Sequence, residues 1–65
     1  MQTFGARLKR IRKERGLSQG QLAKKSGVYQ QAIGAYERNQ MSPTLKSIEW
    51  LCGALGLTAS ELLGF

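Results

Sequence analysis

Apolar residues in this chain recur three or four positions apart, which is the spacing of one face of an α-helix. Near the start, Phe4, Leu8 and Ile11 follow that spacing, and Ile48 and Leu55 belong to a second such series. No stretch shows the alternation of apolar and polar residues that is typical of a half-buried strand. The pattern therefore predicts an all-α protein without internal repeats.

Glycine, serine, threonine and proline divide the chain into five segments with helical spacing. The expected helices run over about 3–15, 18–25, 30–38, 44–55 and 58–63. In the last two we expect apolar side chains that face inward, namely Leu45, Ile48, Leu51, Cys52, Leu55, Leu62, Leu63 and Phe65. The short connections between segments are typical of a compact helical domain.

Two segments begin with the sequence pattern of a capping box. Ser18 and Thr58 are each followed three residues later by a side chain that reaches back to the cap, Gln21 and Glu61 respectively. Tyr29 precedes the third segment, and a tyrosine side chain does not cap a helix in this way. We therefore expect the third helix to begin without a side-chain cap.

The length and charge narrow the class of protein. Sixty-five residues hold one hydrophobic core, and 42% of them are hydrophobic, so we expect a single folded domain over residues 1–65. Lysine and arginine number 10 against 4 acidic residues, which gives a net charge of +6. Such an excess favours a polyanionic partner, either nucleic acid or an anionic membrane surface.

The composition argues against an enzyme, a metal site or a bound cofactor. The chain has no histidine, one cysteine, and four carboxylates that are spread along it. It has no apolar run of the roughly 20 residues that cross a bilayer, and its first residues lack a secretory signal pattern. We expect a cytoplasmic protein. A membrane-surface role for the first segment is disfavoured, because its apolar residues are needed for so small a core.

The second and third segments flank a turn over residues 26–29 that contains Gly27, which is the arrangement of a DNA-binding helix–turn–helix. The residues that match this motif are Gln19, Leu22, Ala23, Gly27, Val28, Gln30, Gln31, Ile33, Tyr36 and Glu37. With the flanking segments 8–12, 15–19, 43–45, 55–57 and 61–63, they resemble the lambda-repressor/Cro-like (Xre) family of bacterial and phage regulators. The resemblance implies a compact five-helix domain that binds double-stranded DNA as a transcriptional regulator, more specifically a repressor.

The third segment has an outer face suited to reading bases. At about 100° per residue, Gln30, Gln31, Gly34, Ala35 and Arg38 fall opposite the apolar residues of that segment. A glutamine amide pairs with adenine in the major groove, and small residues allow close approach. We expect base contacts from Gln30, Gln31, Gly34 and Ala35. The alternative is that the two glutamines are simply solvated.

The candidate phosphate contacts are Gln19, Tyr29, Arg38, Asn39 and Arg12. The resemblance implies the role of Gln19, at a helix N-terminus, and it also pairs Arg12 with Glu37 as an ion pair. The alternative for that pair is two independent solvated charges. Six basic residues between Arg7 and Arg15 either steer DNA or form a solvated face.

One recognition helix reads few base pairs, so we expect a homodimer on an inverted-repeat operator. Trp50 falls opposite the apolar stripe of the fourth segment, where an exposed aromatic residue often marks a partner surface. The alternative function is therefore a protein-interaction module of the same fold, such as a toxin-neutralising antitoxin.

Overall fold

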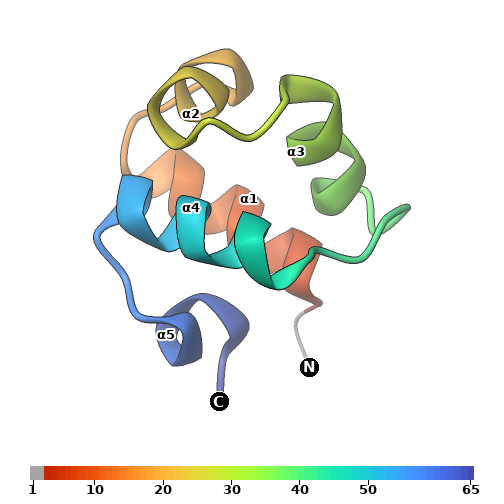
Figure 1. Cartoon of the computed structure of the whole chain (residues 1–65), viewed down its shortest axis with the longest axis vertical. Coiled ribbons are helices and arrows are strands. Elements are labelled where there is room, and N and C mark those ends of the chain that lie inside the picture. Colours follow the sequence, from red (N-terminus) through yellow and green to blue (C-terminus); the bar gives the residue numbers. More distant parts are fainter. Residues whose placement is uncertain (1–2) are drawn as a thin grey trace.

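The computed structural model describes residues 3–65, and this part of the chain forms five helices joined by short loops (Figure 1). They are α1 (Phe4–Glu14), α2 (Gln19–Ser26), α3 (Gln30–Glu37), α4 (Leu45–Leu55) and α5 (Ala59–Leu63). The all-α, five-helix architecture predicted from the sequence is confirmed, and the helix ends lie close to those expected. The turn between α2 and α3 is one residue shorter than predicted, because Ser26 belongs to α2.

Local hydrogen bonds explain where the helices begin. Both predicted capping boxes form, so that Ser18 and Gln21 exchange hydrogen bonds at the start of α2, as do Thr58 and Glu61 at α5. Tyr29 makes no side-chain cap to α3, as the sequence led us to expect. Each capped start satisfies backbone N–H groups that a bare helix end leaves without a partner.

A single core joins these elements. Helices α2 and α3 pack against each other, α1 also contacts α3, and α2 contacts α4. Figure 1 places α5 at the opposite end of the molecule from α2 and α3, where it packs on α1 and α4. The buried apolar side chains are Leu8, Ile11, Leu22, Val28, Ile33, Tyr36, Leu51, Leu55 and Leu62. Tyr36 also donates a buried hydrogen bond of 3.0 Å to Ser47 Oγ, which ties α3 to α4.

Two residues predicted to face the core are exposed instead. Leu45 is 81% exposed and Phe65 is 88% exposed. Leu45 is the first residue of α4. Helical spacing gives the direction in which its side chain points, but it does not show whether another segment covers that end of the helix. Phe65 follows Gly64, whose positive φ of 87° ends α5 and redirects the chain. The interpretation of both as core residues was wrong.

Arg7 in α1 and Arg15 just after it bind the carbonyl ends of other helices. Arg7 donates to the carbonyl oxygens of Glu61 (2.7 Å) and Leu62 (3.3 Å) in α5. Arg15 donates to the carbonyl oxygen of Leu55, at the end of α4, over 3.2 and 3.3 Å. Cations are favoured there because helix C-termini carry a partial negative charge. These two side chains link the first helical segment to α4 and α5. The two interpretations of the basic run, a surface that steers DNA or a solvated face, did not include this structural role.

Candidate nucleic-acid interface

The outer face of α3 carries the predicted base-reading residues. Gln30 and Gln31 are both exposed. Together with Gln19, Gly34 and Arg38 they line a hollow of about 460 Å³ between α2 and α3. Ala35 is half-buried on the same helix. The structure therefore brings together amide groups from two helices and one cation on a single open surface.

Two glycines shape the floor of this surface. A methyl group on Gly20 would lie 3.3 Å from Oε1 of Gln30, so the missing side chain lets Gln30 rest against α2. Gly34 was expected on the open face, but it is buried. The reason is that two side chains lie over it, since a methyl group there would be 3.0 Å from Nη1 of Arg38 and 3.5 Å from Oε1 of Gln19.

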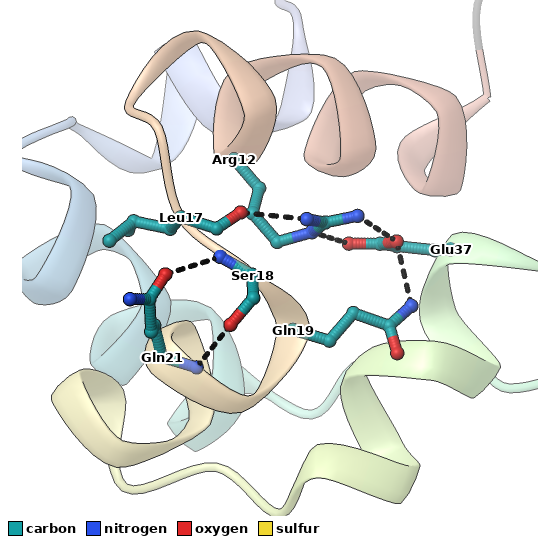
Figure 2. A network of polar contacts seen from close by, with 6 residues as sticks. All are labelled: Arg12, Leu17, Ser18, Gln19, Gln21 and Glu37. Carbon is teal, nitrogen blue, oxygen red and sulfur yellow. Dashed lines mark hydrogen bonds and ion pairs between the residues drawn. The ribbon is translucent and has the colours of Figure 1, made fainter.

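A polar network holds α1, α2 and α3 in register behind this face (Figure 2). The guanidinium of Arg12 donates to both carboxylate oxygens of Glu37, from Nε at 2.6 Å and from Nη2 at 3.0 Å. Its Nη1 donates to the carbonyl oxygen of Leu17 at 2.8 Å. Gln19 donates from Nε2 to Glu37 Oε1 at 3.0 Å. The two planar groups meet edge to edge through two hydrogen bonds, a geometry that fixes orientation as well as distance.

This network is shielded from water. The side chains of Arg12 and Glu37 are only 8% and 3% exposed. Burial alone would raise the pKa of Glu37, but hydrogen bonds from Arg12 and Gln19 and the nearby positive charge outweigh it, so the pKa lies below its usual value. The hydrogen bond with Glu37 raises the pKa of Arg12, against the opposing effect of burial. Both groups are therefore charged near neutral pH, and the pair adds no net charge to the surface.

The remaining phosphate candidates differ in their surroundings. Tyr29 is 82% exposed beside the N-terminus of α3. Asn39 adopts a left-handed φ of 57°, and its Oδ1 accepts from the backbone N–H of Gly5 at 3.2 Å. Arg38 is exposed at the end of α3 and donates from Nε to Gln40 Oε1 at 3.0 Å. Arg12 makes the three hydrogen bonds described above and exposes little surface, so any phosphate contact from it depends on the N–H groups left over.

Gly5 is a structural residue that the sequence reasoning missed. It is buried where α1 meets the end of α3, and a methyl group there would collide with the carbonyl oxygen of Tyr36. It would also lie 2.8 Å from the carbonyl oxygen of Glu37. No sequence signal distinguishes Gly5 from any other helical glycine, because the atoms that crowd it come from α3 and from Asn39, more than thirty residues away.

An apolar groove lies next to the candidate interface. Trp50 is 47% exposed, and it lines a hollow of about 390 Å³ with Tyr29, Met41 and Ala32, among others. The structure thus places Trp50 at a partly open apolar site. No helix in residues 3–65 has the length and apolar character needed to cross a membrane.

A helix-turn-helix family model matches residues 8–62, which is most of the chain. This chain belongs to the helix-turn-helix family. The match confirms the resemblance drawn from the motif around α2 and α3 and from its flanking segments.

Named relatives agree with this family assignment. The immunity repressor protein of Bacillus phage phi105 is 42% identical over 62 residues, which cover 95% of this chain and 43% of that protein. An uncharacterized HTH-type transcriptional regulator, y4dJ of Sinorhizobium fredii, is 36% identical over 91% of this chain and 77% of its own length. The chain spans less than half the length of the phage repressor and 31% of the Escherichia coli regulator PuuR.

Solved structures of helix-turn-helix proteins share the same architecture. The restriction-modification controller protein C.AhdI from Aeromonas hydrophila superimposes with a TM-score of 0.88 at 40% identity, covering 92% of this chain and 91% of that one. A complex of SinR protein with SinI protein gives a TM-score of 0.89 at 34% identity, with coverage of 94% and 60%. This chain is therefore a helix-turn-helix domain of the type found in transcriptional regulators.

Proposed function

We propose that this helix-turn-helix domain binds double-stranded DNA in sequence-specific fashion and represses transcription. Helix α3 enters the major groove, where Gln30 and Gln31 read base edges and the short side chain of Ala35 allows close approach. Gly34 contributes by leaving room for the side chains of Arg38 and Gln19 that lie over it. The observation that carries the proposal is the exposed pair of glutamines beside a hollow shared by α2 and α3. The alternative is that the two glutamines are merely solvated, and the enrichment experiment below distinguishes the two.

The phosphate backbone is held from the edges of the same surface. Gln19 at the start of α2, Tyr29, Asn39 and the free N–H groups of Arg12 are the proposed contacts. Oδ1 of Asn39 accepts a hydrogen bond from the backbone N–H of Gly5, so the amide N–H groups of the same side chain are available to donate to a phosphate oxygen. The net charge of +6 adds attraction that weakens steeply with salt.

We further propose a homodimer on an inverted repeat, located in the cytoplasm with the DNA it binds. One copy of α3 spans a few base pairs, and two-fold dimers place two such helices about one DNA turn apart. Sedimentation of the protein with a full repeat and with a half-site tests this directly. A single copy bound to the full repeat at saturation would rule out the dimer.

Enrichment of duplexes from a randomised pool tests the DNA-binding function. The parent should enrich a short inverted repeat, and Gln30→Ala and Gln31→Ala should each flatten the preference at one or two positions per arm. Lys46→Ala, which removes one exposed charge from α4, serves as the control and should keep the repeat. If both glutamine variants enrich the same repeat as strongly as the parent, the reading face is assigned incorrectly.

The apolar groove around Trp50 favours a second candidate, a module that binds a partner protein. The two functions differ in their response to salt. The logarithm of the DNA-binding constant falls linearly with the logarithm of salt concentration, whereas docking into an apolar groove does not show this dependence. A parent that shows no duplex binding even at low salt would favour the second candidate.

A further inference from the structure

The geometry points to Arg38 as a residue that reads a guanine base, rather than one that only holds the phosphate backbone. This inference rests on the proposed function and adds a specificity-determining residue to the same site. Arg38 follows Gly34 by one helical turn, and its backbone N–H donates to the Gly34 carbonyl oxygen at 3.1 Å. Because helical side chains lean toward the N-terminus, the Arg38 side chain runs back over position 34.

Gly34 provides the space for that path. Its φ is not in the left-handed region, so backbone geometry does not require glycine there. A glycine inside a helix is unfavourable relative to alanine, and here its effect is to leave room for a guanidinium. Nη1 of Arg38 lies 3.0 Å from the position that a methyl group on Gly34 would occupy. The cation therefore rests on the floor of the reading surface rather than at its rim.

The guanidinium is oriented but not neutralised. Its Nε donates to Gln40 Oε1 at 3.0 Å, which holds one edge of the group. Within residues 3–65, no carboxylate forms an ion pair with Arg38. The two outer nitrogens of its guanidinium, Nη1 and Nη2, make no hydrogen bond to these residues. Two parallel N–H donors thus remain open in the hollow that Gln30 and Gln31 also line.

This donor pair matches guanine. In the major groove, guanine presents two acceptors, O6 and N7, and a bidentate arginine is their commonest specific contact. The glutamine amides on the same surface suit adenine instead. We therefore expect each half-site to contain a guanine close to the bases that Gln30 and Gln31 contact.

Enrichment from a randomised duplex pool separates the two roles of Arg38. If Arg38 reads guanine, Arg38→Ala should lower the preference for guanine at one position per arm by about 5- to 150-fold. Arg38→Lys should recover little of it, because a lysine offers a point charge and not a planar fork. Lys13→Ala removes one exposed charge from α1 and should keep the preference. Circular dichroism checks that each variant is folded.

A modified base then tests the contact itself. Replacing that guanine with 7-deazaguanine removes N7 and keeps the base pairing, so it should weaken binding by the parent but not by Arg38→Ala. If Arg38→Ala instead weakens binding equally for all sequences and lowers the salt slope by about one, it is a phosphate contact and the inference fails. A parent that enriches no sequence at all would overturn the proposed function, and the guanine assignment with it.

Discussion

Two arginine–glutamate pairs in this chain differ in burial and allow a matched test of what the network behind α3 contributes. Arg12–Glu37 joins α1 to α3, and its side chains are 8% and 3% exposed. Arg10–Glu14 spans one turn of α1, and its side chains are 43% and 53% exposed. Replacing the arginine of each pair with methionine removes the charge and keeps most of the length of the side chain.

The expected effects differ by several kcal/mol. Arg12→Met leaves a buried carboxylate with Gln19 as its remaining donor, and removing one partner of a buried pair costs about 3–5 kcal/mol. Arg10→Met should cost no more than about 0.5 kcal/mol, because an exposed pair one turn apart contributes little. At about 0.05–0.15 kcal/mol per residue, a chain of this length has about 3–10 kcal/mol of stability. Arg12→Met should therefore lose about a third or more of the stability of the domain.

Urea unfolding followed by circular dichroism measures both variants. The double variant Arg12→Met with Glu37→Met completes the cycle, and it should be more stable than Arg12→Met alone, since no buried charge is then left unpaired. A loss below about 1 kcal/mol for Arg12→Met, the range of an exposed pair, would refute the reasoning. Glu37→Met alone is the remaining corner of the cycle, and a double variant whose loss equals the sum of the losses from Arg12→Met and Glu37→Met would also refute it.

Three further predictions concern glycines and pH. Gly5→Ala should destabilise the domain by about 1–3 kcal/mol or more, since its methyl group meets backbone atoms of α3. Gly53→Ala should raise the stability by up to about 1 kcal/mol through helix propensity, because no atom lies within 4 Å of the added methyl group. Melting temperatures that shift in the same direction for Gly5→Ala and Gly53→Ala would contradict this. Gly34→Ala should keep or raise the melting temperature yet reduce the guanine preference, and unchanged preference would count against the role of Arg38. Because the pKa of Glu37 is lowered by folding, its contribution is complete above the ordinary glutamate pKa of about 4.3 and is lost as the pH falls below it. Unfolding measured across this range should show a shallower acid slope for Glu37→Gln than for the parent, and equal slopes would contradict the pKa assignment.

The parts of the fold that the sequence predicted are those set by local interactions. Capping boxes at Ser18 and Thr58 join residues three apart, and helical spacing separates the inner and outer faces of α3. The outward position of Gln30 and Gln31 follows from that spacing alone. Their contacts with DNA stay a prediction, because which bases they meet depends on the partner as well as on the chain.

The parts that the sequence could not predict depend on contacts between distant segments. Arg7 and Arg15 bind carbonyl groups 40 or more residues away, and nothing near them in the sequence marks those partners. The exposure of Leu45 could not be predicted, because helical spacing does not reveal where the surface that covers α4 ends. Gly34 is buried because two longer side chains fold over it, which a helical wheel does not show.

Assigned backbone amide spectra of the protein, recorded during titration with its enriched duplex, test the central claim most directly. The account predicts that the largest shifts and the protein–DNA contacts fall on Gln30, Gln31, Gly34 and Arg38, while Gly53 on the exposed side of α4 is unchanged. Contacts concentrated around Trp50, with the amides of α3 unmoved, would contradict it.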